Sequence, residues 1–205
     1  MHIKNIKTAG KSLQEAEKVL IMIHGRGGNA QDILGLASEL NVSDYAFLAP
    51  AATNNTWYPY SFMVNSEHNE PWLSSALELL KEVVDNVMEQ GISSENIYLL
   101  GFSQGACLTL EFAARNAKKY GGIVAFTGGL IGDVINRDNY SGNFSGTPIF
   151  IGTGNPDQHI PVERVEESQS ILEEMNAEVK VKVYEGRPHT ISQDEIEIAN
   201  RLIFN

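Results

Sequence analysis

The sequence predicts an α/β fold in which a mostly parallel central sheet is covered by helices on both faces. Along the 205 residues, short runs of β-forming apolar residues alternate with segments of helical periodicity, and this alternation is typical of parallel sheets. Two of the runs, IMI at 21–23 and IFI at 149–151, are apolar throughout. Unbroken apolar strands are expected where both faces of a sheet are buried.

The elements follow from these patterns in chain order. Strands are predicted at 19–23, 45–50, 96–100, 121–126, 148–152 and 179–185, and a further edge strand is predicted around Ile3 and Ile6. Helices are predicted at 30–40, 71–89, 104–117, 162–175 and 193–204. The second helix carries apolar residues at 3.6-residue spacing, namely Leu73, Ala76, Leu77, Leu80, Val84 and Val87. Asn29 with Asp32, and Ser192 with Glu195, have the spacing of residues that cap helices.

The composition indicates a globular protein that does not span a membrane. The chain is 42% apolar and 20% charged, which is ordinary for a globular protein and fits one domain over 1–205. No run approaches the roughly 18 apolar residues of a membrane span, and the first 18 residues lack the apolar core of a signal peptide. We therefore expect a cytoplasmic protein without stable membrane insertion. Its expected state is a monomer or a homodimer, although no pattern in the sequence distinguishes the two.

The net charge and the single cysteine argue against nucleic-acid binding, an intramolecular disulfide and a Cys-rich metal site. The formal net charge is −11, so phosphate backbones would be repelled and nucleic-acid binding is not expected. Cys107 is the single cysteine, which rules out an intramolecular disulfide and a Cys-rich metal site. We expect this thiol to be buried as a small apolar residue, and we expect no metal and no cofactor.

The segment GFSQG, residues 101–105, places Ser103 between two glycines where a predicted strand meets a predicted helix. This is the context of a nucleophile elbow, a strained turn that exposes the serine hydroxyl above the sheet. Glycines two residues before and after Ser103 remove Cβ atoms that would collide with the neighbouring strand and helix. The alternative is a tight turn with a helix-capping serine.

A serine hydroxyl needs a base, and the base needs an orienting carboxylate. In this kind of fold the chain order is Ser, then Asp or Glu, then His. His189 follows the last predicted strand and is the favoured base, with His159 as the alternative. Asp157 directly follows the strand at 148–152 and is the favoured acid over Asp133 and Asp138.

The segment HGRGG, residues 24–28, follows an early strand and offers a place for backbone N–H groups that stabilise an oxyanion. One donor is predicted at Gln104, after the nucleophile, and the second at Arg26. Gly25 and its neighbouring glycines let this backbone approach the substrate. His24 is expected to pack and to fix the loop.

The loop 53–71 is dense in aromatic residues, namely Trp57, Tyr58, Tyr60, Phe62 and, just beyond it, Trp72. Two interpretations stay open: these rings form the wall of an apolar substrate pocket, or they pack a long loop onto the body of the protein.

With these motifs in hand, the chain resembles the phospholipase/carboxylesterase family of α/β-hydrolases, which includes the acyl-protein thioesterases. The resemblance rests on HGRGG, the tryptophan of NNTWYP, GFSQG, GNPDQHIP and the late His189. It implies an α/β-hydrolase fold without a large cap domain and the roles already assigned to Ser103, Asp157 and His189. It also implies Trp57 as a pocket residue. Arg26 stands where many members carry an apolar residue, so its charge either favours an anionic substrate or points to solvent.

The sequence thus predicts a serine esterase that acts on a small-molecule ester through an acyl-enzyme. An acyl thioesterase and a lactone hydrolase are alternative enzymes, and a non-catalytic binding protein of the same fold is the alternative from another class.

Overall fold

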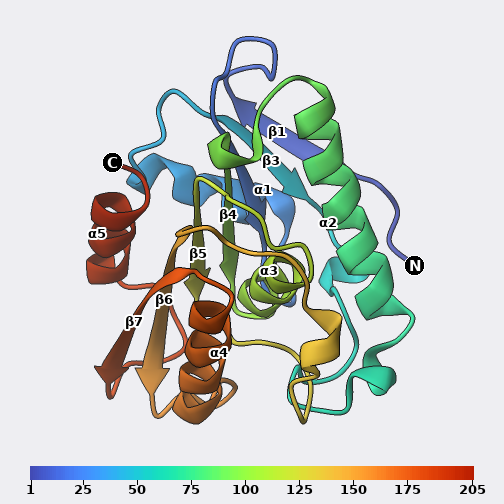
Figure 1. Cartoon of the computed structure of the whole chain (residues 1–205), viewed down its shortest axis with the longest axis vertical. Coiled ribbons are helices and arrows are strands. Elements are labelled where there is room, and N and C mark those ends of the chain that lie inside the picture. The colour runs from blue at the N-terminus through green and yellow to red at the C-terminus, as the bar shows by residue number, and fades with distance from the viewer.

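A computed structural model describes residues 1–205 and contains one seven-stranded sheet (Figure 1). The strands are β1 (Ile6–Gly10), β2 (Val19–Ile23), β3 (Ala46–Pro50), β4 (Ile97–Phe102), β5 (Gly122–Phe126), β6 (Pro148–Asn155) and β7 (Glu178–Glu185). Their order across the sheet is β1-β3-β2-β4-β5-β6-β7. Only β1 is antiparallel to its neighbour. The mostly parallel sheet of the predicted α/β-hydrolase fold is therefore confirmed.

Five α-helices connect and flank the strands: α1 (Ala30–Gly35), α2 (Trp72–Glu89), α3 (Gln104–Arg115), α4 (Val162–Glu174) and α5 (Gln193–Leu202). The predicted helix 30–40 is α-helical only as far as Gly35, a residue of low helix propensity, and continues as a 3₁₀ helix over Leu36–Glu39. Both predicted caps are present. Asn29 accepts from the N–H groups of Gln31 and Asp32, and Ser192 with Glu195 forms a capping box.

The core has two parts because alternate strand residues point to opposite faces of the sheet. On one face Ile21, Leu99 and Ile123 pack with α2, α3 and α4. On the other face Leu20 and Leu100 pack with α1 and α5. Helices thus cover both faces, which explains why the central strands are apolar throughout.

The predicted edge strand exists but begins later than expected. Ile6 opens β1, which pairs with β3, whereas Ile3 precedes the strand and is 74% exposed. The helices lack the combination of length and continuous apolar sequence that crossing a bilayer requires.

The topology gathers four loops at one edge of the sheet. Because β2, β4, β6 and β7 are parallel, their carboxyl ends lie on the same side, and each is followed by a segment that the sequence analysis singled out. These segments carry Arg26, Ser103, Asp157 and His189, respectively.

Candidate active site

Ser103 occupies a sharp turn between β4 and α3. Its backbone has φ 56° and ψ −121°, a conformation that non-glycine residues adopt only where the surrounding structure enforces it. A Cβ at Gly105 would lie 2.3 Å from the carbonyl oxygen of Ile23, and a Cβ at Gly101 would lie 2.3 Å from that of Gly105. The two glycines are therefore required by close packing of the turn, as the sequence predicted.

Three side chains that are far apart in the sequence meet beside this turn. The Nε2 atom of His189 lies 2.7 Å from Ser103 Oγ, and its Nδ1 atom lies 2.8 Å from Asp157 Oδ2. Because Asp157 is an acceptor when ionised, Nδ1 carries the ring proton and Nε2 is free to accept the serine proton. The favoured base and acid thus form one hydrogen-bonded chain with the serine.

The Asp157 carboxylate is firmly held. Its side chain is fully buried, and Oδ1 accepts the backbone N–H groups of His159 at 2.8 Å and Ile160 at 2.9 Å. Burial acts to raise the pKa of Asp157, but the N–H of His159, the His189 ring and the N–H of Ile160 outweigh it and lower that pKa below its ordinary value. The acid therefore stays ionised and its second oxygen is left for His189.

His159, the alternative base, packs against His189 and forms no hydrogen bond with Ser103 Oγ, whose partner is His189 Nε2. The two rings meet edge to face with their centroids 5.1 Å apart. The side chains of Asp133 and Asp138, the alternative acids, form no hydrogen bond with His189.

The two predicted oxyanion donors both border the pocket beside Ser103. Gln104 is the first residue of α3, so its N–H has no acceptor within the helix. The N–H of Arg26 has no hydrogen-bond acceptor in the structure. Both groups are therefore available to an incoming negative charge.

His24 fixes the loop that carries Arg26. The ring is buried, its Nε2 accepts the N–H of Ala52 at 3.1 Å, and its Nδ1 donates to the carbonyl of Gly25 at 2.8 Å. Burial lowers the pKa of His24, so the neutral ring is favoured. The expected packing role agrees with these contacts.

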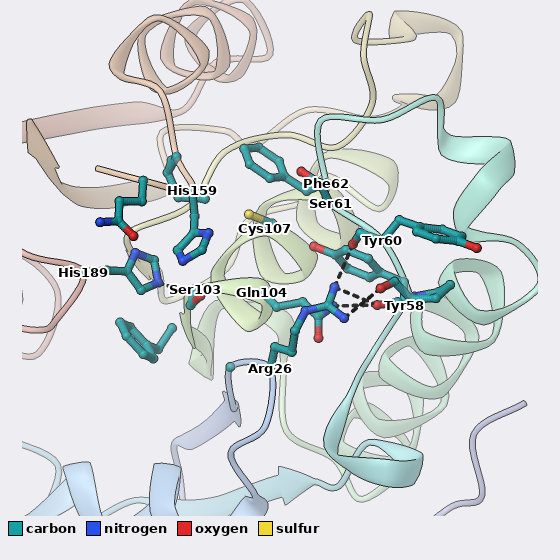
Figure 2. A pocket seen from close by; sticks show the side chains of 15 residues that line it. Arg26, Tyr58, Tyr60, Ser61, Phe62, Ser103, Gln104, Cys107, His159 and His189 are labelled. Atoms are coloured by element: carbon teal, nitrogen blue, oxygen red, sulfur yellow. Dashed lines mark hydrogen bonds between the residues drawn. The ribbon is translucent and has the colours of Figure 1, made fainter. Parts of the chain in front are cut away.

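A pocket with a cavity volume of about 660 Å³ opens at Ser103 (Figure 2). Tyr58, Tyr60 and Phe62 of the aromatic loop contribute to its lining, and so do His159 and Ile160. The complete lining is Gly25, Arg26, Tyr58, Pro59, Tyr60, Ser61, Phe62, Phe102, Ser103, Gln104, Cys107, Gln158, His159, Ile160 and His189. Gly25 borders the pocket as predicted.

The placement of Trp57 differs from the prediction. The side chain is completely buried and does not line the pocket; its Nε1–H donates to the carbonyl of His24 at 2.8 Å. The ring packs between those of His2 and His24. Both interpretations of the aromatic loop therefore hold in part, because Trp57 anchors it to the core and the rings that follow form the pocket wall.

Sequence reasoning missed several pocket residues and the contacts of Arg26. Gln158 lines the pocket, and so does His159, which the sequence analysis considered only as an alternative base; both lie on the loop after β6, a position that the predicted strand end could have indicated. Cys107 is buried as expected, which raises its pKa to about 12, but it also contributes to the pocket floor. Arg26 is exposed, yet its guanidinium does not extend freely into solvent, since it donates three hydrogen bonds to the backbone of the aromatic loop.

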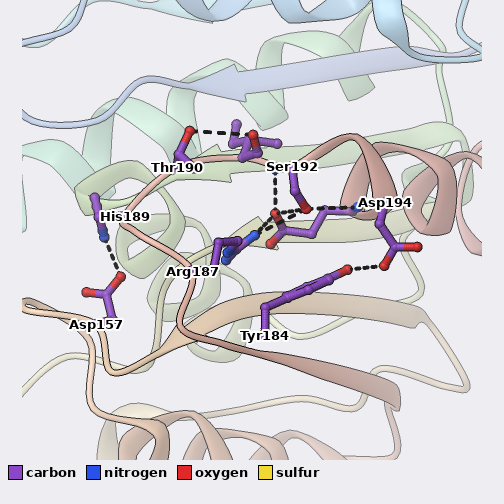
Figure 3. A network of polar contacts seen from close by, with 9 residues as sticks. Asp157, Tyr184, Arg187, His189, Thr190, Ser192 and Asp194 are labelled. Carbon is purple, nitrogen blue, oxygen red and sulfur yellow. Dashed lines mark hydrogen bonds and ion pairs between the residues drawn. The ribbon is translucent and has the colours of Figure 1, made fainter.

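A second polar network supports the loop of His189 (Figure 3). Arg187 forms an ion pair with Glu195, whose side chain is fully buried. Glu195 Oε2 also accepts the N–H and the hydroxyl of Ser192, at 2.8 and 3.0 Å. A Cβ at position 152 would collide with the other oxygen of this carboxylate, so Gly152 makes room for it.

Nowhere in the chain do three or more His, Cys, Asp or Glu side chains gather as they would around a metal ion. The expectation of no metal and no cofactor stays a prediction.

Comparison with known proteins identifies the family. The family model described as phospholipase/carboxylesterase matches residues 5–204. A crystal structure of a phospholipase/carboxylesterase from Dyadobacter fermentans is 57% identical, covers 100% of this chain and 98% of its own, and superposes with a TM-score of 0.99. Acyl-protein thioesterase 1 of Saccharomyces cerevisiae is 29% identical over 95% of both chains. Carboxylesterase SOBER1 of Arabidopsis thaliana is 25% identical over 89% of this chain and 87% of its own. The chain belongs to the phospholipase/carboxylesterase family of α/β-hydrolases.

Proposed function

We propose that this protein is a serine esterase that cleaves carboxylic esters of small molecules through an acyl-enzyme intermediate. The observation that carries the proposal is the chain of hydrogen bonds from Ser103 Oγ through His189 to Asp157, with both links at 2.7–2.8 Å. The names of the relatives, carboxylesterases and acyl-protein thioesterases, agree with this chemistry.

In the first half of the reaction, Ser103 Oγ attacks the ester carbonyl while His189 Nε2 takes its proton. Asp157 keeps the ring in the tautomer that can accept this proton and stabilises the imidazolium that results. As the tetrahedral intermediate collapses, His189 returns the proton to the leaving alcohol and the acyl group stays on Ser103.

In the second half, water replaces the alcohol. His189 removes a proton from the water, the oxygen attacks the acyl carbon, and the carboxylic acid leaves as Ser103 regains its proton. The N–H groups of Arg26 and Gln104 donate to the oxyanion in both halves. Removal of one such donor costs about 3 kcal/mol of transition-state stabilisation in other serine hydrolases.

A thioester is the second candidate substrate class, because relatives along nearly the whole chain are named acyl-protein thioesterases. Parallel assays with oxygen esters and thioesters of two, eight and sixteen acyl carbons distinguish the two. A preference for long thioesters would favour the thioesterase, and cleavage of lactones but not of linear esters would favour the lactone hydrolase.

The proposal is tested with Ser103→Ala. Turnover of p-nitrophenyl acetate should fall by at least about 10³-fold, since the nucleophile is lost and only binding and oxyanion contacts remain. A fluorophosphonate probe should label the wild-type protein and not the variant. Ser43 is exposed, and Ser43→Ala serves as the matched control that keeps wild-type rate and labelling. Equal turnover by Ser103→Ala would reject the esterase, and absence of labelling in the wild type would favour a binding protein.

We also propose a cytoplasmic enzyme, monomeric or homodimeric, that binds no nucleic acid. The buried Cys107 has no disulfide partner, so folding needs no oxidising compartment, and the net charge of −11 disfavours polyanions. Light scattering coupled to size exclusion measures the oligomeric state.

A further inference from the structure

We propose that Arg26 is a positioning residue for the oxyanion hole: its guanidinium ties the glycine-rich loop that offers the Arg26 N–H to the backbone of the pocket wall. This inference rests on the proposed esterase function, since it assigns a task to the side chain of one expected oxyanion donor.

The guanidinium spans three consecutive carbonyl groups (Figure 2). Nη2 donates to Tyr58 O at 2.9 Å and to Tyr60 O at 2.7 Å, and Nη1 donates to Pro59 O at 2.9 Å. The cation also lies 6.0 Å from the centroid of the Tyr58 ring. Such a planar fork of donors is specific to arginine, because a lysine ammonium is a compact group on a flexible stem.

Gln104, the other expected oxyanion donor, binds the same segment. Its buried side chain donates from Nε2 to Tyr58 O at 2.8 Å and accepts the N–H of Trp57 at 2.9 Å. The carbonyl of Tyr58 thus accepts hydrogen bonds from both Arg26 and Gln104. The side chains of both expected oxyanion donors are therefore held by the same peptide group of the pocket wall, which fixes the positions of their backbone N–H groups relative to each other.

The loop of Arg26 needs such a tie. Arg26 is flanked by Gly25, Gly27 and Gly28, and Gly27 has φ +77°. Glycine backbone has the largest conformational freedom in the unfolded and locally opened states. His24 is held by Ala52 and Trp57, and the N–H of Gly27 donates to Asn55 O at 2.8 Å. The Arg26 side chain adds the link from the tip of the loop to residues 58–60.

The same contacts argue against anion recognition by Arg26. Three of the five guanidinium N–H groups are donated to neutral carbonyls. A substrate carboxylate could use only the two remaining N–H groups unless it displaced these bonds, so we assign the guanidinium chiefly to holding the loop.

The test compares Arg26→Met, Arg26→Lys and the control Arg201→Met, which removes an exposed arginine whose side chain forms no hydrogen bond. Steady-state hydrolysis of p-nitrophenyl acetate gives kcat and KM. A trifluoromethyl ketone, which forms a tetrahedral adduct with the serine, gives an inhibition constant that reports the oxyanion hole. Rates are normalised to the active sites that a fluorophosphonate labels at completion.

We expect Arg26→Met to lower kcat by about 10- to 100-fold, a part of the 10²- to 10³-fold effect of deleting an oxyanion donor. KM should stay within about threefold, and the ketone should bind more weakly by the same factor as kcat falls. Arg26→Lys should lose at least about tenfold in kcat, because it keeps the charge but not the fork. Arg201→Met should match the wild type.

Wild-type kcat in Arg26→Lys would overturn the inference, because charge alone would then suffice. It would also be overturned if Arg26→Met kept kcat for neutral esters and raised KM only for esters that carry a carboxylate. If Arg26→Met does not fold, the lysine variant decides. Failure of the esterase proposal is distinguishable, because it would show as Ser103→Ala retaining turnover whatever the Arg26 variants do.

Discussion

The carboxylate of Glu195 pairs with the guanidinium of Arg187 directly behind the loop that carries His189. The Glu195 side chain is fully buried and that of Arg187 is only 10% exposed. The same carboxylate closes the capping box of α5 through Ser192. One buried ion pair therefore joins the end of β7, the His189 loop and the start of the last helix.

Replacing Glu195 with glutamine should destabilise the protein strongly. The neutral amide leaves the Arg187 guanidinium buried without a counter-charge, and breaking a buried pair in this way typically costs about 3–5 kcal/mol. Urea unfolding at pH 7.5 measures the free energy of unfolding. Glu197 is exposed on the same helix, and Glu197→Gln should change that free energy by less than about 0.5 kcal/mol. Similar small changes in both variants would contradict the assigned role of the pair.

Replacing Asp157 with asparagine should leave the fold intact and slow catalysis. The amide can present its NH₂ to Nδ1 and favour the wrong tautomer of His189, an exchange that costs about 10⁴-fold in kcat in a related triad. We expect a loss of about 10³- to 10⁴-fold in kcat for p-nitrophenyl acetate, with an unchanged circular dichroism spectrum. Asp138→Asn, at an exposed carboxylate, should retain full activity. A loss in Asp138→Asn and none in Asp157→Asn would show that the wrong acid has been chosen.

Protonation of His24 should make the protein less stable in mild acid. Burial holds the pKa of His24 below its ordinary value, so the unfolded chain takes up the proton first as the pH falls. Stability is therefore lost as pH drops below about 6.5, with a slope of at most about 1.4 kcal/mol per pH unit for one group. The loss stops once pH passes the lowered pKa of the folded state.

His24→Gln isolates this contribution. Glutamine has no titrating ring, so the difference in unfolding free energy between wild type and variant should be largest at pH 7.5 and should shrink towards pH 5. His68 is exposed, and His68→Gln should preserve the wild-type pH dependence. A difference for His24→Gln that stays constant from pH 7.5 to pH 5 would contradict the prediction. Asp157 does not interfere with this measurement. Its pKa is held below its ordinary value, so the stability that it contributes is lost only at a lower pH than that of His24.

Most of the fold was predictable because it follows from local rules. The apolar runs became strands, and the capping residues Asn29 and Ser192 mark true helix starts. The sharp turn at Ser103 was predictable for the same reason, since two glycines at fixed spacing admit a conformation that other residues would obstruct. The start of β1 was less predictable, because an edge strand with one half-buried isoleucine carries little apolar pattern.

The sequence indicated that the loop 53–71 is rich in aromatic residues, but not which of its rings line the pocket. Whether a ring faces the core or the cavity depends on the path of an irregular loop, and so Trp57 is buried while Tyr58, Tyr60 and Phe62 line the pocket. The contacts of Arg26 were unpredictable for the same reason. They involve three carbonyl groups more than 30 positions later in the chain, whose convergence no residue type encodes.

The lengths of the last two strands have a consequence for how the site tolerates motion. The pairing of β5 with β6 ends at Gly152, but β6 and β7 remain paired as far as Asn155 and Glu185, so a two-stranded ribbon extends beyond the rest of the sheet. Asp157 and His189 follow the two tips of this ribbon, whereas Ser103 follows the shorter β4. If the ribbon flexed as a unit, acid and base would move together and keep their separation. Such a motion would alter instead the gap between the imidazole and the hydroxyl, because these two groups stand on different parts of the sheet.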